Sequence, residues 1–547
     1  KKKKKKKKNI FFFFFFFFFF PPTLVRAQFG GKGAGTDSDP YQITNADELF
    51  EVRNDLLASY KMMNDVDLEQ WIEEDNPTQG WSPIGNTDTP FQGTFDGNNK
   101  VIKGLYIKRT TMDNVGLFGH VLQTTIKNLA LLAPIVTGND NVGALVGSAP
   151  LVTYNNSKGE HCNIENIVVF GGVVSGINCV GGIVGSLNVS IYVPGVTTAG
   201  IIGCYSSSVI NAKGTKCGGI CGSANGYVST NNWGVTNYGY SCKVSIRDNS
   251  FMGKVQGKSY VGGILGELTR LGNLSYCECL QNIVVGGIIG EEHVSGIAGN
   301  FISDGSTLLK YNVSMADTIS AFSSSPYRIV DNEWPNNFAY SGTKAFANGK
   351  SVTLEDNNYN GTAYGLKTLK KQSTYEGMEF DFSNQWTIVE GETFPYNKRQ
   401  SAPPTVTSFT AGNKGSISGT ATGNGGVYVM VGNDIYESYI LDNKWSVTLG
   451  AISKGTMVKV MTRYAGLMPS IFVTAVATSG SGDTPEILKG DANGDGSVDT
   501  VDAVAIVNHI LGKSSVSFVE ANADLNGDGQ VSVDDAVATV QLILDKQ

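Results

Sequence analysis

Two stretches near the C-terminus space Asp and Asn residues so that several side-chain oxygens can converge on one point. Each is twelve residues long, with Asp or Asn at positions 1, 3, 5 and 12, Gly at position 6 and a backbone carbonyl on offer at position 7. Calcium takes six to eight oxygen ligands, and Gly at position 6 makes the sharp turn that gathers them. The sequence therefore predicts two Ca²⁺ ions, with the ligands Asp491, Asn493, Asp495, Ser497 and Asp502 in the first loop and Asp524, Asn526, Asp528, Gln530 and Asp535 in the second.

An amphipathic helix is expected after each loop, over Ala503–Leu511 and Ala536–Leu544, where apolar residues recur at helical spacing. Gly512 suits the end of the first helix. A single loop of this kind could be a solvated acidic turn, but two in the same register, each leading into a matching helix, favour metal sites. Because the module is small and its acids repel one another, we expect calcium to fold it.

These loops resemble the type I dockerin domain. An EF-hand has Glu at position 12 and a helix before the loop, whereas both loops here end in Asp and Glu486–Lys489 is too short for that helix. The resemblance covers residues 487–547 and implies binding to a cohesin partner, usually in systems that degrade polysaccharides. Dockerins usually carry Ser or Thr at loop positions 10 and 11, which are the partner-binding positions; here these are Thr500, Val501, Val533 and Asp534, a departure that concerns cohesin recognition and not calcium.

The long middle of the chain repeats short apolar blocks bracketed by glycine. β-prone runs lie between the blocks, and the final glycines of successive blocks are 28, 38, 37, 44 and 24 residues apart. A fixed block with loops of variable length indicates a solenoid whose turns bury their faces against one another, with glycine at the tight corners. We therefore predict a mainly β chain that begins with a right-handed parallel β-helix over residues 29–400; a β-sandwich with unusual loops is the alternative. The blocks are Val115–Gly119, Val142–Gly147, Val180–Gly185, Cys217–Gly222, Val261–Gly266 and Val285–Gly290.

The blocks resemble the GLUG repeat of secreted bacterial surface proteins. The preceding segments Gly35–Ile43, Trp81–Gly85 and Phe91–Asn98 resemble the opening turns of β-helix proteins that carry this repeat. The resemblance implies the fold and says little about activity. Residues 46–58 are predicted to form an amphipathic helix that caps the first turn, because an uncapped solenoid end invites edge-to-edge aggregation.

All eight cysteines lie between Cys162 and Cys279, within the solenoid. The favoured interpretation is a set of small buried residues stacked along the core. Disulfides between adjacent turns are possible in an exported chain, and a zinc site is the third interpretation, although no C-x-x-C pair occurs.

Groups suited to catalysis are sparse in the solenoid. Glycosidases need two carboxylates that flank the scissile bond, yet the one adjacent Asp-Asp pair is Asp534–Asp535, in the second calcium loop. The cluster most like a site is Glu291-Glu292-His293, for which a solvated turn is the favoured interpretation. Because acids can converge from separate turns, the sequence leaves an enzyme open and leans against one.

A second β region follows Pro403 and Pro404. Alternating runs between Ser416 and Val476 with a central Trp445 predict an immunoglobulin-like sandwich over residues 401–478, which we interpret as a spacer. Trp445 is expected in its core rather than as a platform for sugar stacking. Residues 479–486 are predicted to be a flexible linker to the dockerin-like module over 487–547.

The N-terminus has the layout of a secretory signal peptide, predicted over residues 1–28. A basic run, Lys1–Lys8, precedes eleven apolar residues, Ile10–Phe20, which are too few to span a bilayer as a helix. An artefact of low complexity is the alternative. We expect a secreted, extracellular or cell-surface protein without a transmembrane segment.

The net charge of −7 argues against a nucleic-acid partner. We predict a non-catalytic binding or adhesion protein whose solenoid presents a recognition surface for a glycan, host or matrix ligand. Its tail is predicted to bind two Ca²⁺ ions and to dock to a cohesin-like partner. The alternatives are a polysaccharide lyase or glycoside hydrolase on the same solenoid, and a stalk without a specific ligand.

Overall fold

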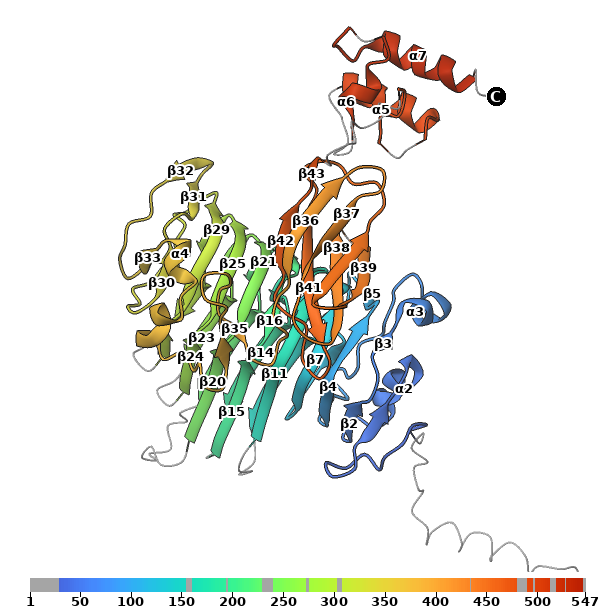
Figure 1. Cartoon of the computed structure of the whole chain (residues 1–547). Coiled ribbons are helices and arrows are strands. Elements are labelled where there is room, and N and C mark those ends of the chain that lie inside the picture. The colour runs from blue at the N-terminus through green and yellow to red at the C-terminus, as the bar shows by residue number, and fades with distance from the viewer. Residues whose placement is uncertain are drawn as a thin grey trace, which may run out of the picture. The chain divides into compact units, whose positions relative to one another are not determined.

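Figure 1 shows the computed structural model, coloured from the N-terminus to the C-terminus. The predicted signal peptide and all but the first residue of the predicted linker lie outside the residues that the structure describes. The chain forms two compact units, Lys1–Arg399 and Gln400–Gln547, and each is described by itself. The structure describes residues 29–544 except for 154–159, 193–194, 229–239, 272–274, 303–306, 433, 480–488, 495–496, 512–517 and 527.

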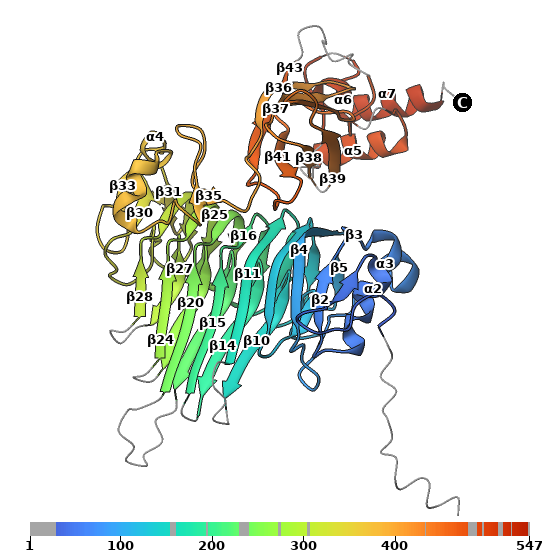
Figure 2. The same ribbon diagram turned by 60° about the horizontal axis from the view of Figure 1, so that its bottom comes forward.

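The first unit is a parallel β-helix, as the sequence predicts, and not the alternative sandwich. Each turn in the central part of the solenoid passes through a five-stranded sheet, a six-stranded sheet and then twice through a 22-stranded sheet. Strands of successive turns pair in parallel and lie side by side along the solenoid in Figures 1 and 2. The pair β31–β32, near the C-terminal end, is antiparallel.

The strands of the two smaller sheets contain the glycine blocks. The five-stranded sheet consists of β9 (Val142–Gly143), β13 (Val180–Gly181), β18 (Thr215–Gly218), β22 (Ser259–Gly262) and β26 (Glu292–Ser295). The six-stranded sheet consists of β6 (Phe118–His120), β10 (Val146–Thr153), β14 (Val184–Ile191), β19 (Cys221–Val228), β23 (Leu265–Leu271) and β27 (Ala298–Ile302).

The large sheet holds the remaining strands of the solenoid. They are β1 (Tyr41–Ile43), β2 (Ser59–Met62), β3 (Val66–Asp67), β4 (Thr94–Lys103), β5 (Tyr106–Lys108), β7 (Thr125–Leu132), β8 (Ile135–Thr137), β11 (Glu160–Phe170), β12 (Val173–Gly176), β15 (Gly195–Ile202), β16 (Tyr205–Ser206), β17 (Val209–Ala212), β20 (Tyr240–Arg247), β21 (Ser250–Gln256), β24 (Ser275–Leu280), β25 (Ile283–Gly290), β28 (Thr307–Lys310), β29 (Val313–Ala321), β30 (Phe338–Tyr340), β31 (Lys344–Ala347), β32 (Lys350–Val352) and β33 (Thr362–Tyr364).

The glycine blocks build a tight corner between the two smaller sheets. The final glycine of a block packs against the backbone of the preceding turn: a Cβ on Gly299 would lie 2.3 Å from the carbonyl carbon of Tyr260. No side chain fits there, so the corner demands glycine. The residue just before each of the six corners takes a left-handed backbone conformation, with φ between 50° and 67°, at Asn114, Asn141, Cys179, Lys216, Tyr260 and His293.

Five of the six predicted blocks occupy this corner, and the prediction of the sixth was wrong. Val285–Gly290 belongs to β25 of the large sheet, where the register shifts after Gly286. The sixth corner is Val294–Gly299, whose Val294 pairs with Val261 of the preceding turn. Its Ser295 and Ala298 stand where other blocks have glycine and a larger apolar residue, which hides the repeat in the sequence.

A ladder of buried asparagines joins the later turns at the bend between their two passes through the large sheet. The side-chain amide of Asn249 donates to Oδ1 of Asn282 at 3.0 Å, Asn282 donates to Asn312 at 2.9 Å, and Asn312 donates to Asn337 at 3.2 Å. All four are buried. Since a buried amide must be bonded, the ladder fixes the stacking register of these turns.

The predicted cap over residues 46–58 is present but shorter. Helix α2 (Ala46–Glu51) continues as the 3₁₀ helix η1 (Val52–Asn54), and Leu49 and Val52 are buried in the solenoid core. The helix stops there because the chain must enter β2, which pairs with β1 and β4. A further helix, α3 (Glu69–Asp75), was not predicted.

A strap, residues 365–399, runs back along the flank of the solenoid. It contains α4 (Leu366–Leu369), η2 (Gln372–Met378), β34 (Trp386–Thr387) and β35 (Tyr396–Asn397). Its apolar residues, among them Trp386, cover Ile283 and Val313 of the large sheet. Hydrogen bonds join it to four levels of the solenoid, between Glu379 and Tyr311, Trp386 and Asp248, Asn397 and Gly203, and Arg399 and Asn128.

The second unit begins with two four-stranded sheets. Trp445 is buried with Ile417, Val429 and Val460 between them, so its predicted place in a core is confirmed. Within each sheet the neighbouring strands are antiparallel, apart from the parallel pair β36–β43. One sheet has the order β40 (Lys444–Thr448), β37 (Ser416–Thr420), β36 (Thr405–Ala411), β43 (Thr478–Ser479), and the other β39 (Asp434–Tyr439), β38 (Gly425–Val431), β41 (Met457–Tyr464), β42 (Val473–Val476).

Candidate metal centre and docking surface

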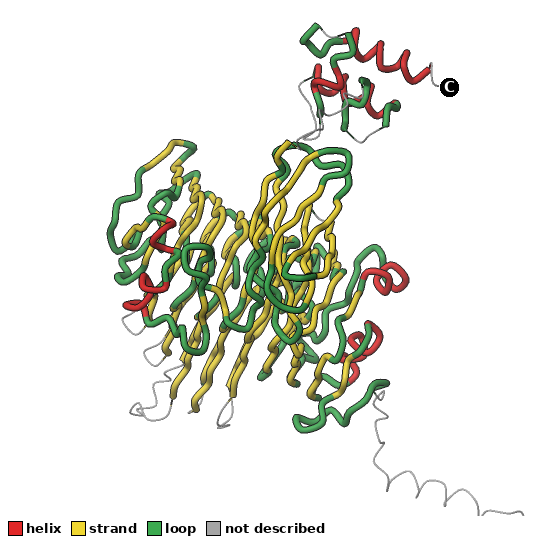
Figure 3. Tube along the Cα trace, in the orientation of Figure 1, coloured by secondary structure: helices red, strands yellow, loops and turns green. Residues whose placement is uncertain are grey.

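Helices dominate the C-terminal module, in contrast to the strands of the rest of the chain (Figure 3). They are α5 (Thr500–Ile510), α6 (Glu520–Ala523) and α7 (Val533–Leu544). The two long helices occupy the predicted positions, but each begins three residues earlier than expected.

A cap at loop position 9 explains the earlier start. Asp499 Oδ1 accepts a hydrogen bond from the Val501 N–H at 2.8 Å, and Asp502 Oδ2 accepts one from the Asp499 N–H at 2.9 Å. Ser532 repeats this at α7, where its hydroxyl accepts from the Asp534 N–H at 3.2 Å. The sequence analysis overlooked these caps, although a short polar residue followed three positions later by an acid is a local signal for them.

The carboxylates at position 12 tie each loop to its helix. Asp502 and Asp535 are both fully buried. Asp502 Oδ1 accepts from the Asn493 N–H at 3.0 Å, and Asp535 Oδ1 accepts from the N–H groups of Leu525 and Asn526 at 2.9 and 3.2 Å. In both halves of the module the last loop residue holds the backbone of position 3 on one side and of position 9 on the other, and in the second half it also holds position 2.

These bonds set the charge state of Asp535. Burial by itself raises the pKa of this carboxyl, but the N–H groups of Ser532, Asn526 and Leu525 and the Ser532 hydroxyl favour the charged form more strongly. The net result is a pKa below the usual value for Asp.

The other predicted ligands of the second loop turn their oxygens toward the loop backbone. Asp524 accepts from the N–H groups of Asp528 and Gly529 at 3.2 and 3.0 Å, and Asn526 Oδ1 accepts from the Asp528 N–H at 2.8 Å. Asp528 Oδ1 accepts from the Gln530 N–H at 2.8 Å. Gly529, at position 6, has a φ of 84°, as the expected sharp turn requires. A carboxylate or amide oxygen has two lone pairs, so one accepted hydrogen bond does not prevent it from binding a cation.

The first loop is described in part. Asp491 is buried, Asn493 is half-buried and Ser497 is exposed, while Asp495 lies outside the described residues. Within the described part of the chain, no three His, Cys, Asp or Glu side chains lie together as metal ligands. The structure therefore places the predicted ligands in one loop each without closing a coordination shell; the donor set itself, carboxylate and amide oxygens around a tight turn, fits Ca²⁺.

Two apolar stripes lie exposed on the long helices. The small core of the module consists of Ala492, Ile506, Ala523 and Ala536; Leu542 and Ile543 are half-buried, and most of the other large apolar side chains of the two helices are exposed. The four predicted partner-binding residues, Thr500, Val501, Val533 and Asp534, are all exposed in the first turns of these helices. The stripes consist of Val501, Val504, Val507, Ile510 and Leu511 on α5 and of Val533, Val537, Val540 and Leu544 on α7, each 38–62% exposed.

The cluster Glu291-Glu292-His293 was expected to be a solvated turn, but only Glu291 lies in a bend, and Glu292 and His293 belong to strand β26. Glu291 and Glu292 are exposed. His293 takes the left-handed corner position, its Nδ1 lies 2.6 Å from an Asp331 carboxylate oxygen, and its ring packs against Tyr260.

The eight cysteines carry free thiols, and seven are buried. Cys217 stacks in register between Val180 and Val261, which is the expected core arrangement. Burial raises the pKa of Cys162 to about 12 and that of the partly exposed Cys179 to about 11.

The described chain thus combines a β-solenoid with a C-terminal module built from a duplicated loop-helix unit. Residues 489–543 match the family model described as "Dockerin type I domain". Type I dockerin domains typically bind calcium, imply a cohesin partner and occur on extracellular proteins of the cellulosome type.

Two curated proteins are similar over 122 residues, which is 21% of this chain. One is the "Putative Gly-rich membrane protein" of Evansella cellulosilytica, at 36% identity, and the other is "Halomucin" of Haloquadratum walsbyi, at 34% identity. The match spans 14% of the first protein's length and 1% of the second's. The solved structure titled "Crystal structure of a putative immunoglobulin A1 protease from Bacteroides ovatus at 1.30 A resolution" is 21% identical, with a TM-score of 0.44, over 67% of this chain and 94% of that chain.

In the part of the chain that the structure describes, no helix has the length and apolar composition that crossing a bilayer demands.

Proposed function

We propose that this chain is a secreted or cell-surface, non-catalytic binding protein that docks to a cohesin-like partner through its C-terminal module. The observation that carries the proposal is the pair of exposed apolar stripes next to the two loops, within residues that match a dockerin domain. Exposed apolar area of this extent on so small a module marks an interaction surface.

The proposed calcium ligands are those at positions 1, 3, 5, 7 and 12 of each loop. When bound, each Ca²⁺ neutralises the acids of its loop. Asp502 and Asp535 carry this effect into the helices, since the same carboxylates hold the backbone N–H groups of position 9, where α5 and α7 are capped. Calcium therefore orders the stripes by ordering the loops. The ligands are Asp491, Asn493, Asp495, Ser497 and Asp502, and Asp524, Asn526, Asp528, Gln530 and Asp535.

The duplication gives two nearly equivalent docking faces. Val504 and Val537 occupy the same position relative to their loops, and so do Leu511 and Leu544. The predicted partner-binding residues at loop positions 10 and 11 differ between the two halves, because position 11 is Val501 in one half and Asp534 in the other. If a partner binds one stripe at a time, a substitution in one stripe leaves the other available. Binding is then lost only when both stripes are substituted.

The proposal assigns a role to each of the other predicted domains. Residues 29–400 form the GLUG-type solenoid that recognises a ligand, residues 401–478 an immunoglobulin-like spacer, residues 479–486 a linker, and residues 487–547 the docking module. The antiparallel sheets around Trp445 support the spacer assignment.

Calorimetric titration of the full chain with isolated type I cohesin domains tests the proposal. We expect binding in calcium and none in EGTA. The single variants Val504→Lys and Val537→Lys keep binding, the double variant loses it, and Val476→Lys, on exposed strand β42, serves as the matched control. Equal affinity with and without calcium, or full affinity in the double variant, would overturn the docking assignment.

A further inference from the structure

A groove crosses four neighbouring turns of the solenoid where strands β8, β12, β17 and β21 end. Its cavity volume is about 370 Å³, and residues from each of these strands or from the turns after them line it. Nothing in the docking proposal uses this groove, which lies in the first unit.

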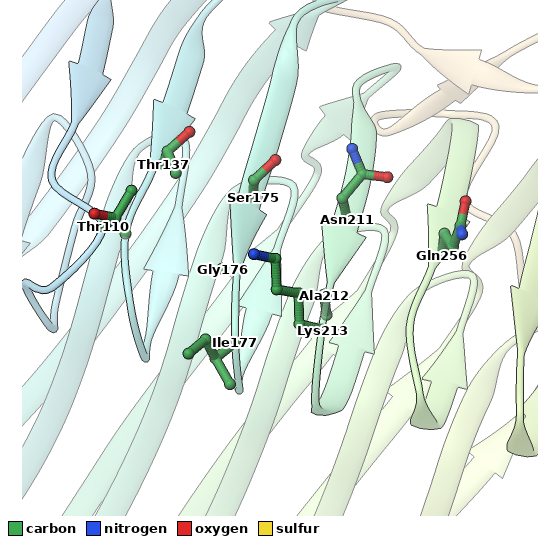
Figure 4. A pocket seen from close by; sticks show the side chains of 10 residues that line it. Thr110, Thr137, Ser175, Gly176, Ile177, Asn211, Ala212, Lys213 and Gln256 are labelled. Carbon is green, nitrogen blue, oxygen red and sulfur yellow. The ribbon is translucent and has the colours of Figure 1, made fainter.

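One wall is a row of uncharged polar side chains, here called the polar row: Thr137, Ser175, Asn211 and Gln256. They pair in register from strand to strand, so they are spaced by the distance between strands, about 4.8 Å. Figure 4 shows the four side chains side by side on successive strands and pointing the same way. Two hydroxyls and two amides in line present a donor and an acceptor at every step.

Two glycines of the groove lining pack against the solenoid core. Gly138 and Gly176 lie over the stacked valines of the glycine blocks: a Cβ on either residue would stand 2.8 Å from a methyl group of Val142. A Cβ at either position would point at these buried valines, so the packing of the core requires glycine there and the two positions add no side chain to the groove lining.

The charge of the groove is positive. Lys213 is the one charged side chain among its lining residues, and in Figure 4 it reaches alongside Gly176. Lys108 continues the polar row, in register with Thr137, and Lys254 pairs with Val209 nearby; both are exposed. In a chain with a net charge of −7, this local excess favours an anionic ligand over a short, salt-sensitive range.

Two other polymers fit the groove poorly. An extended peptide binds a sheet by adding to a free edge, but β12 and β17 each have neighbours on both sides. Single-stranded nucleic acid relies on aromatic side chains for base stacking, and the groove lining contains none. A linear polymer with hydroxyls at regular intervals and occasional carboxylates matches both the polar row and Lys213.

We propose that this groove binds a linear acidic polysaccharide, laid across the turns of the solenoid, with sugar hydroxyls on the polar row and a uronate carboxylate on Lys213. This inference rests on the recognition role in the proposed function and names its site and its ligand class.

The test is a titration of the full chain with a hexameric oligogalacturonate and with the same oligosaccharide methyl-esterified at its carboxyls. We expect the acid form to bind and the ester to bind at least about tenfold more weakly, the effect of losing one charge-assisted hydrogen bond. Lys213→Ala and Asn211→Ala should each weaken binding of the acid form about tenfold. Lys350→Ala, an exposed lysine on β32 outside the groove, should leave it unchanged.

The groove assignment falls if the parent chain does not bind the acid form at millimolar concentration, if the ester binds equally, or if Lys213→Ala binds like the parent. Tighter binding of an oligothymidylate of similar length would overturn the ligand class. The cohesin titration on the same preparation reports on docking separately. Release of reducing ends would contradict the non-catalytic part of the proposed function while leaving the groove in place.

Discussion

The buried carboxylate of Asp535 offers the sharpest test of how the tail is held together. Asp535→Asn keeps the size of the side chain but removes its charge and replaces one acceptor oxygen with a donor. The Ser532 N–H, bonded at 2.9 Å to Oδ2, then loses its partner, and the bonds from Leu525 and Asn526 lose their charge assistance. An unpartnered buried N–H costs about 1–3 kcal/mol and each weakened bond about 0.5–1 kcal/mol, so we expect a loss of about 3 kcal/mol.

This loss is large for the module, because its core consists of Ala492, Ile506, Ala523 and Ala536 and has little stability in reserve. Hydrogen exchange of the full chain in calcium, followed by mass spectrometry, measures the opening of α7 directly. About 3 kcal/mol corresponds to a loss of amide protection of about a hundredfold. Asp534→Asn is the matched control, since it makes the same chemical change at the exposed neighbouring position and should alter protection less than about twofold.

Parent-like protection of α7 in Asp535→Asn would show that the buried carboxylate does not join loop to helix. A similar loss in Asp534→Asn would show that the charge of the helix N-terminus, and not the hydrogen bonds, is what matters.

Four further predictions concern pH, the corner, the ladder and the thiols. Because the pKa of Asp535 is lowered on folding, its stabilising contribution is complete above the pKa of the unfolded chain and is lost as pH falls through the folded pKa; protection of α7, corrected for intrinsic exchange, should be constant from about pH 7 to 5 and fall below about pH 4. Gly299→Ala should prevent soluble folding, because its Cβ would meet backbone of the preceding turn, whereas Gly365→Ala, with nothing within 4 Å, should express like the parent; equal yields of the two would contradict the steric argument. Asn312→Ala should lower the free energy of unfolding of the first unit in urea by about 2–3 kcal/mol by leaving ladder partners unbonded, and exposed Asn54→Ala by less than about 0.5 kcal/mol. Iodoacetamide at pH 8 should leave the seven buried cysteines unlabelled in the native protein, label the partly exposed Cys179 only slowly because its pKa is raised to about 11, and label all eight in guanidinium; rapid native labelling of the buried seven would contradict their burial and raised pKa.

The solenoid could be predicted because its strongest demands are local. A tight corner has no room for a Cβ, and the glycines that satisfy it recur in the sequence. The same reasoning predicted the sixth corner at the wrong place. Val285–Gly290 has the glycine pattern but lies in β25 of the large sheet, whereas Val294–Gly299 forms the corner although Ser295 and Ala298 interrupt its pattern. The spacing of glycines in the sequence does not show whether a given glycine packs against the backbone of the preceding turn.

Features that depend on distant partners were not predictable. The bond between Trp386 and Asp248 joins residues 138 positions apart, and no short-range signal announces the strap. The asparagine ladder is likewise a product of stacking: Asn282 and Asn312 are ordinary turn residues until the turns align them.

In the candidate site, too, features that depend on local sequence could be predicted, and features that depend on the packing of distant residues could not. Loop ligands and helices follow from spacing, and the caps at Asp499 and Ser532 were within reach of a local rule that was not applied. The outward direction of the apolar stripes was out of reach, because an amphipathic pattern names an apolar face without saying whether the protein itself covers it.

The strap determines how the protein carries mechanical load. As the strap advances from Glu379 to Arg399, its contacts move back through the solenoid from Tyr311 to Asn128. Tension on the chain beyond Arg399 therefore pulls along the flank and not on the last turn. If the C-terminal module docks as proposed, a pull on it reaches the solenoid through the strap before it reaches the last turn.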